Sequence, residues 1–237
     1  MKNVSPSSAA KEVPVEPVKD KVIGFLTRFR KPILIGLAVV ATVTVALVVV
    51  FSVQAARSEA ALVAVEDLQD EYEQWLRLEP EERAAAYQGI GDSVSDLVAE
   101  YPRTYAAVRA RILDARALTE LERWEEASLR FVEAADAGAG TYLEPVALTD
   151  AAVAAENGSD VDRALELHRR IAEQFAGESP DVPRAWFSIG RILEQRGDVV
   201  EAADAYRRLV SSYPNSSWTN LARNRIISLT IEGRIGG

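Results

Sequence analysis

Few side chains in this sequence could catalyse a reaction or bind a metal ion. The chain has no cysteine and one histidine, His168, so it offers no thiolate nucleophile, no histidine-based metal site and one candidate base for a serine triad. His168 falls in a helical pattern where an aromatic core residue is expected, and we expect it to be buried. Ser8 and Lys11 have S-x-x-K spacing, but they lie in a polar tail. The sequence therefore predicts no enzyme, no cofactor and no metal site.

Arginines at a repeated spacing are the best candidates for a binding site. Arg109 and Arg116 are seven residues apart, as are Arg184 and Arg191. Seven residues make two helical turns, so each pair shares one face of a helix. Such a ladder on a concave surface could bind a carboxylate or an acidic peptide. The alternative is that the arginines pair with acids of the chain itself, among them Glu120, Glu156 and Glu194.

The elements that would position these arginines form a helical repeat. Within residues 183–216, six positions match the pattern W-x2-L-G-x2-Y, A-x3-F, P: Trp186, Gly190, Gly197, Ala202, Tyr206 and Pro214. This segment resembles the tetratricopeptide repeat, a helix–turn–helix unit of about 34 residues. Small residues at 190 and 202 predict a close helix crossing, with the aromatic rings filling the adjacent gaps. Gly197-Asp198 predicts the turn, with the Asp198 side chain capping the second helix.

The repeat recurs along the chain. Second-helix anchors fall at Ile90, Ala127, Ala164 and Ala202, with spacings of 37, 37 and 38 residues. First helices are expected near 105–121, 145–156 and 184–196, with a degenerate one near 60–78. Segment 217–231, apolar at Trp218, Leu221, Ile226 and Leu229, predicts a capping helix. The predicted fold is all-α: one N-terminal transmembrane helix followed by a tetratricopeptide-like α-solenoid.

An uncharged stretch from Pro32 to Ala56 predicts the membrane helix. Residues 32–53 would span about 33 Å as a helix, enough to cross the hydrocarbon core. Basic residues gather before it, at 19–31, so the positive-inside rule places the N-terminus in the cytoplasm and the repeats on the far side. Val53-Gln54-Ala55 has the small residues of a signal-peptidase site. The apolar run is longer than a leader's, which favours an uncleaved anchor.

Charge and composition define the remaining segments. Residues 1–18 predict a disordered cytoplasmic tail, and residues 19–31 a basic juxtamembrane segment, either a short interfacial helix or a flank of the anchor. Residues 54–78 predict an amphipathic linking helix with an apolar stripe at Leu62, Val65, Leu68, Tyr72, Trp75 and Leu76. Residues 79–231 form the repeat domain and 232–237 a tail. The degenerate first repeat leaves a helix face compatible with a homodimer.

The repeat domain is strongly acidic. Residues 1–53 carry seven Lys/Arg against three Asp/Glu, whereas residues 54–237 carry 20 against 33. A domain of this charge repels phosphate backbones, so we expect no binding to nucleic acid.

The junction FRKPILIGLAVVATVTVALVVVF followed by ARSEAALVAVEDLQDEYEQW resembles that of the YfgM-like ancillary subunits of the bacterial Sec translocon. The resemblance implies a scaffold or holding chaperone in the inner membrane, with its repeats in the periplasm. Its partners would be translocon subunits, an isomerase-type periplasmic chaperone and exported polypeptides. The YPNSSWTNLARNRI ending is also similar to outer-membrane assembly lipoproteins and Tol-Pal-associated proteins, which implies an alternative role as a structural assembly factor of an envelope complex, of the outer-membrane assembly or cell-division type.

Overall fold

The structure is a computed structural model in which residues 18–236 are described. Within that range the chain forms nine helices and no strand, so the predicted all-helical class is confirmed. The chain divides into two units, Met1–Ala55 and Ala56–Gly237, which are treated separately. The predicted disordered tail at 1–18 lies outside the described residues, except for Val18, where the first helix begins.

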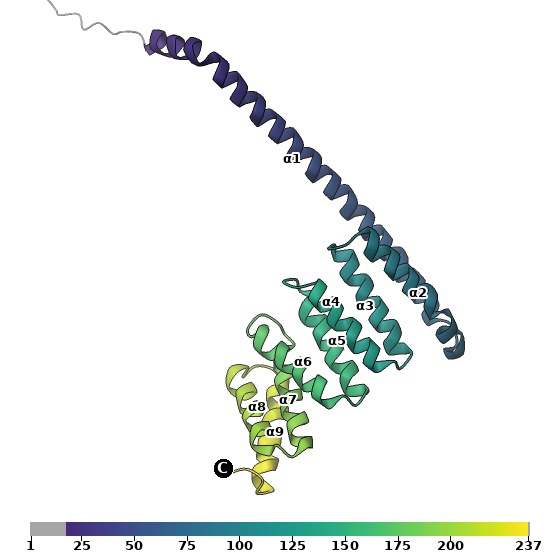
Figure 1. Ribbon diagram of the computed structural model, residues 1–237. Coiled ribbons are helices and arrows are strands. Elements are labelled where there is room, and N and C mark those ends of the chain that lie inside the picture. The colour runs from purple at the N-terminus through teal and green to yellow at the C-terminus, as the bar shows by residue number, and fades with distance from the viewer. Residues whose placement is uncertain (1–17, 237) are drawn as a thin grey trace, which may run out of the picture. The chain divides into compact units, whose positions relative to one another are not determined.

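The first unit contains the apolar stretch of helix α1 (Val18–Leu76), drawn in purple and blue in Figure 1. The sequence divided 19–53 into a basic segment and an apolar helix, whereas the structure has one helix that continues through Pro32. The hydroxyls of Thr42 and Thr44 donate to backbone carbonyls one turn earlier, both at 2.9 Å. The apolar stretch of α1 is exposed, long enough and apolar enough to cross a membrane.

The second unit begins with residues 56–76 of α1, which share a core with α2 (Pro80–Glu100) and α3 (Tyr105–Glu120). Most of the predicted apolar stripe is buried in that core: Val65, Leu68, Tyr72 and Trp75. The prediction for Leu62 is wrong, because Leu62 is exposed and Ala61 is buried instead. At 3.6 residues per turn, position 62 points about 100° away from the centre of the buried face.

Six further helices continue the array: α4 (Trp124–Ala137), α5 (Leu143–Asn157), α6 (Val161–Gln174), α7 (Val182–Arg196), α8 (Val199–Ser212) and α9 (Ser217–Ile231). Each packs mainly on its neighbours in sequence, and the first helices of successive repeats also meet, α3 with α5 and α7 with α9. Helical hairpins that contact only their neighbours define a solenoid (Figure 1).

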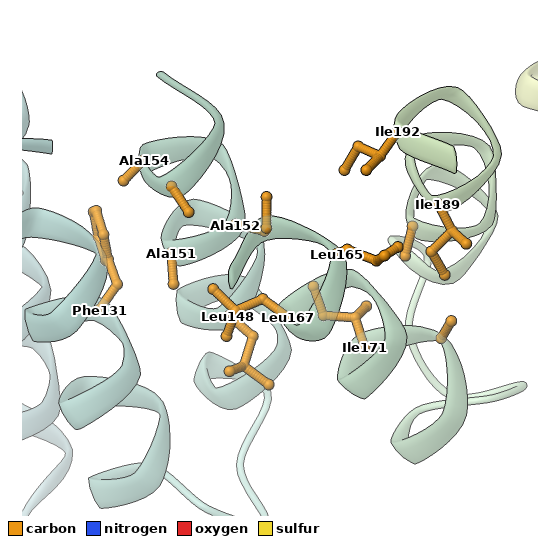
Figure 2. Close-up of a cluster of buried hydrophobic side chains, with 14 of the residues drawn as sticks. Phe131, Leu148, Ala151, Ala152, Ala154, Leu165, Leu167, Ile171, Ile189 and Ile192 are labelled. Carbon is orange, nitrogen blue, oxygen red and sulfur yellow. The ribbon is translucent and has the colours of Figure 1, made fainter. Parts of the chain in front are cut away.

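The core of the array combines small and large side chains in alternation. The predicted anchors of the second helices, Ile90, Ala127, Ala164 and Ala202, are all buried. Larger aliphatic side chains of α5, α6 and α7 fill the space between the helices, as Figure 2 shows for Leu148, Leu167, Ile171 and Ile189. Alanine at the crossings allows the helices to approach, and the aliphatic side chains then fill the gaps to native density.

Gly190 lies where α7 meets α8, and it confirms the predicted close crossing. A Cβ atom at this position would lie 2.6 Å from Cδ1 and 2.8 Å from Cζ of Tyr206, closer than real Cβ contacts. The Tyr206 ring is 1% exposed and its hydroxyl donates to Glu194, so a shift of the ring would disturb that hydrogen bond. The α7–α8 packing therefore requires glycine at 190.

The turn after α7 is formed by Gly197, whose φ of +89° lies in the left-handed region that glycine readily adopts. Asp198 follows as the N-cap residue of α8, but its exposed side chain accepts no capping hydrogen bond, so that part of the prediction is wrong. Three other helices do have side-chain caps, provided by Thr104, Asp160 and Ser216. Asp160 has a backbone similar to that of Asp198, so the difference lies in the side chain.

Helix α9 packs on α8 and α7 and buries Thr219, Ala222 and Leu229. Of the apolar residues that the sequence pointed to in this helix, Leu229 is buried, whereas Leu221 is 47% exposed and the neighbouring Ala222 is buried. Ile227 and Ile231 are exposed as well. The helix therefore presents apolar side chains on its outer side.

Candidate protein-binding face

The helices that begin each repeat, α3, α5 and α7, together with α9, are joined in successive pairs by contacts between side chains. We call this surface the first-helix face and define it by the following residues: Tyr105, Arg109, Arg116, Tyr142, Asp150, Arg184, Arg191 and Arg225. Contacts between these side chains and their neighbours connect α3 to α5, α5 to α7 and α7 to α9. All four arginines singled out from the sequence belong to this face.

Two tyrosines and an arginine form the part of the face nearest the start of α3. The hydroxyls of Tyr105 and Tyr142 lie 2.6 Å apart, and the two rings are 6.2 Å apart. The guanidinium of Arg109 lies over the Tyr105 ring, 5.9 Å from its centroid. Both tyrosines are exposed, at 41% and 67%. Exposed aromatic rings beside an arginine are the residue types most enriched at the energetic centres of protein interfaces.

Asp150 on α5 separates the next two arginines. Arg116 Nη2 lies 3.8 Å from Asp150 Oδ2, with 49% of the arginine side chain exposed. Burial raises the pKa of Asp150, and the neighbouring Asp181 adds to this, while the charges of Arg116 and Arg184 act in the opposite direction. The prediction that the arginines pair with acids of the chain itself holds for Arg116, although its partner is Asp150 and none of the three glutamates named.

Arg191 is bound more firmly within the protein. It donates to Glu156 Oε2, and Glu156 Oε1 lies 2.8 Å from Nε2 of His168. His168 is 1% exposed, so its predicted burial is confirmed. Burial opposes ionisation of Glu156, but the hydrogen bonds from His168 and Arg191 outweigh that effect and lower the pKa of the carboxyl. This group links α5, α6 and α7.

The same arrangement returns one repeat later. Glu194 accepts from the hydroxyl of Tyr206 at 3.2 Å and from Nε of Arg225 at 3.1 Å. Burial and the nearby Glu194 raise the pKa of the Tyr206 phenol. In both repeats a carboxylate on a first helix thus meets a second-helix ring of its own repeat and an arginine of the next. These polar groups join successive repeats.

Four members of the face were not predicted from the sequence: Tyr105, Tyr142, Asp150 and Arg225. The tyrosines are 37 residues apart, which is the repeat period, so the signal was present in the spacing. The role of Asp150 depends on how far successive first helices are offset, and a repeat pattern does not contain that offset. Among the described residues no group of three or more metal-ligating side chains occurs. Ser8 and Lys11 lie outside those residues.

Comparisons with known proteins agree with this architecture. A family model described as a tetratricopeptide repeat matches residues 149–217, which run from α5 to the start of α9. A tetratricopeptide repeat-containing protein of Treponema pallidum (strain Nichols) is 32% identical over 112 residues. That alignment covers 47% of this chain and 46% of the relative, so the chain spans about half the length of the curated relative it matches.

Solved structures show the same fold at low sequence identity. A crystal structure of a putative kinesin light chain of Podosopora anserina, with nearly identical tetratricopeptide-like repeats, gives a TM-score of 0.52 at 15% identity. It covers 72% of this chain, and 89% of that chain is matched. A crystal structure of a single-residue variant of the same protein gives the same TM-score, identity and coverage of this chain, and the match covers 88% of the variant's chain. The chain is thus a tetratricopeptide-like α-solenoid with one N-terminal helix apolar enough to span a membrane, an architecture that indicates a protein–protein interaction scaffold.

Proposed function

We propose that this protein is a membrane-anchored scaffold whose repeat array binds protein partners through the first-helix face. The observation that carries the proposal is the exposed Tyr105–Tyr142 pair beside Arg109. Packing among the described residues does not require two exposed rings at this place, whereas rigid aromatic anchors are what a protein interface uses. Arg116 and Arg184 extend the face along α3 and α7 and would favour an acidic segment of the partner.

The anchor in this proposal is the span at 32–53. Its residues are exposed and uncharged, and the basic residues precede it, which supports a cytoplasmic N-terminus and an extracytoplasmic repeat domain. Tethering confines the array to one membrane surface and raises its effective concentration for partners there. No catalytic step belongs to this role.

The resemblance to YfgM-like translocon subunits supports one assignment within this proposal: a holding chaperone in the inner membrane of a bacterium. Its partners would be translocon subunits, a periplasmic chaperone and exported polypeptides, bound by modest and reversible contacts along the face. The acidic balance of residues 54–237 would keep such a domain away from nucleic acid.

A second candidate function is supported by α9, which exposes Leu221, Ile227 and Ile231. Apolar side chains on the outer side of the last described helix suit a permanent partner, as a structural assembly factor of an envelope complex would have. The same surface suits a homodimer. These partners would bind α9, whereas clients of a holding chaperone would bind α3 and α5.

Site-specific photocrosslinking in native membranes tests the proposal. A photoreactive phenylalanine replaces Tyr142 on the first-helix face or, as a control, Leu129, which is exposed on α4. We expect Tyr142 to capture translocon subunits, a chaperone or many exported chains, and Leu129 to capture few of them. The same photoreactive residue at Ile227, which is exposed on α9, tests the second candidate, and capture of one stoichiometric envelope partner there would favour the assembly factor. Capture of only a second copy of this chain from Tyr142 would contradict binding of other proteins by this face.

A further inference from the structure

The three junctions between first helices are built from equivalent repeat positions. The carboxylate positions are Thr119, Glu156 and Glu194, spaced by 37 and 38 residues like the second-helix anchors. The ring positions are Phe131, His168 and Tyr206, and the positions on the next first helix are Val153, Arg191 and Arg225. In the α5–α7 and α7–α9 junctions, carboxylate, ring and arginine bind one another. The α3–α5 junction has Thr119, Phe131 and Val153 at these places.

At the α3–α5 junction, uncharged side chains therefore occupy the places where the α5–α7 and α7–α9 junctions have a glutamate paired with an arginine. Thr119 donates to the carbonyl of Ala115 in its own helix, so it does not extend across the junction. Phe131 lies against α5, beside Ala151 and Ala154 in Figure 2. These three positions of the α3–α5 junction therefore carry no charge, whereas the same positions of the later two junctions carry a glutamate and an arginine.

A cavity of about 230 Å³ opens at this junction, between α3 and α5. Its lining combines apolar side chains with polar groups: Arg116, Thr119, Phe131, Asp150, Val153, Ala154 and Asn157. The corresponding cavity between α7 and α9, about 320 Å³, is lined by Glu194, Tyr206 and Arg225. A volume of 230 Å³ is below the range for drug-sized ligands but large enough for a single apolar side chain.

Arg116 stands beside this cavity in the repeat position that Arg191 and Arg225 occupy in the later repeats. Those two arginines bind the glutamate of the preceding first helix. The one ion pair of Arg116 among the described residues is with Asp150, at 3.8 Å and with both side chains about a third exposed or more. Exposed pairs of this kind contribute little, so the guanidinium of Arg116 has capacity for a second carboxylate.

We propose that the α3–α5 junction binds one aliphatic side chain of a partner polypeptide and pairs Arg116 with an acidic residue next to it. The partner's carboxylate pairs with Arg116 beside Asp150, and its aliphatic side chain enters the cavity lined by Phe131 and Val153. This inference rests on the proposed function and specifies it: clients are recognised by an aliphatic residue adjacent to an acidic one. The α5–α7 and α7–α9 junctions, whose charges are already paired, hold the array together.

Peptide binding to the full-length protein in lipid nanodiscs tests this assignment. The probes are fluorescein-labelled dodecapeptides of glycine and serine that carry Leu-Glu, Leu-Gln, Ser-Glu or Ser-Gln at the centre, read by fluorescence anisotropy. Loss of leucine should weaken binding about tenfold or more, because one aliphatic side chain leaves the cavity. Loss of the glutamate charge should weaken it up to about fivefold, the size of a partly exposed ion pair.

Two variants separate the site from general charge effects. Arg116→Gln should remove the preference for Leu-Glu over Leu-Gln while leaving the preference for leucine. Arg207→Gln on α8 is the matched control, because the side chains of Arg116 and Arg207 are both 49% exposed and both pair with an aspartate. The control should leave both preferences unchanged.

The proposal is overturned if Leu-Glu binds no tighter than Ser-Gln, or if the two variants have equal effects. Absence of binding by every peptide would also overturn it. Such results leave the proposed function standing when Tyr142 still captures partners in membranes. Failure of that capture, together with absent peptide binding, would refute both.

Discussion

Replacing Gly190 by alanine tests the close packing on which the last repeats depend. The added methyl group would lie 2.6–2.8 Å from atoms of the Tyr206 ring, and Tyr206 is only 1% exposed. The hydroxyl of Tyr206 donates to Glu194, so a shift of the ring also disturbs the group that joins α7 to α9. Accommodating the methyl group therefore requires a shift of the Tyr206 ring that lowers the free energy of unfolding.

The magnitude follows from two opposing effects. Overpacking by one methyl group in a rigid core costs about 1–3 kcal/mol. Removing a glycine from a helix interior returns roughly 0.5–1 kcal/mol. The expected net loss for Gly190→Ala is about 1–2 kcal/mol, which for a domain of this size lowers Tm by roughly 2–8 °C.

Gly89 provides the matched control. It lies inside α2, is exposed, and has no atom within 4 Å of the position of an added Cβ. Gly89→Ala should therefore show only the helix-propensity gain, about 0.5–1 kcal/mol, and raise Tm by a few degrees. Both variants are compared with the unmodified full-length protein by thermal melts followed by circular dichroism, with hydrogen exchange to locate the loss in α7–α9. A Gly190→Ala protein as stable as Gly89→Ala would refute the close α7–α8 crossing.

Three further predictions concern the helix junctions and caps. Arg191→Ala should lower the free energy of unfolding by about 1 kcal/mol in urea melts, because Glu156 keeps only His168 as a partner and the site is partly exposed; an unchanged midpoint would contradict this. The hydrogen bonds that lower the pKa of Glu156 stabilise the fold above the ordinary value of 4.5, and this stabilisation is lost as pH falls through the lowered pKa. Glu156→Gln should therefore flatten the dependence of Tm on pH below the ordinary value, and parallel curves would refute it. Thr104→Ala should cost about 1 kcal/mol by removing a cap to Ala107 N, whereas Asp198→Ala, which removes none, should cost a few tenths in the same melts; equal losses would be contrary to the structure.

The repeat architecture was predictable because its signal lies in residue size at fixed intervals. Ala127, Ala164 and Ala202 are buried at helix crossings, and a crossing tolerates only small side chains. The aromatic slot of His168 followed from the same spacing. Each of these features depends on contacts within one helical hairpin, between residues that are close in the sequence. Such contacts can be predicted from the spacing of residue types in a single sequence.

Two kinds of feature were less predictable: which side of a helix an apolar residue at the edge of a stripe faces, and which hydrogen bonds a side chain forms. Leu62 and Leu221 belong to the apolar patterns of their helices, although the smaller Ala61 and Ala222 are buried, because an apolar residue at the edge of a stripe can point either way. The aspartate at 198 is an N-cap residue by position, and its side chain nevertheless remains in solvent.

The candidate site was predictable in its residues and not in its pairings. The arginine spacing places Arg109 and Arg116 on one side of α3, and Arg184 and Arg191 on one side of α7; that they form a binding surface stays a prediction. Which of them are already neutralised depends on the offset between successive first helices, and that offset follows from packing in three dimensions. The structure pairs Arg191 with Glu156 and leaves Arg116 with a long contact, a distinction that spacing alone does not contain.

The proposed function depends most directly on two features: the repeat domain lies outside the cytoplasm, and its membrane anchor is not cleaved. The chain contains no cysteine, so a single introduced cysteine is the one thiol of the protein that a maleimide can label. Glu201→Cys places a thiol on exposed α8, and Ser8→Cys places one in the N-terminal tail. In spheroplasts, a membrane-impermeant maleimide should label the cysteine at 201 before lysis and the cysteine at 8 only after lysis, with the full-length protein in the membrane fraction. Labelling in the opposite order, or a soluble repeat domain released after Ala55, would contradict the account.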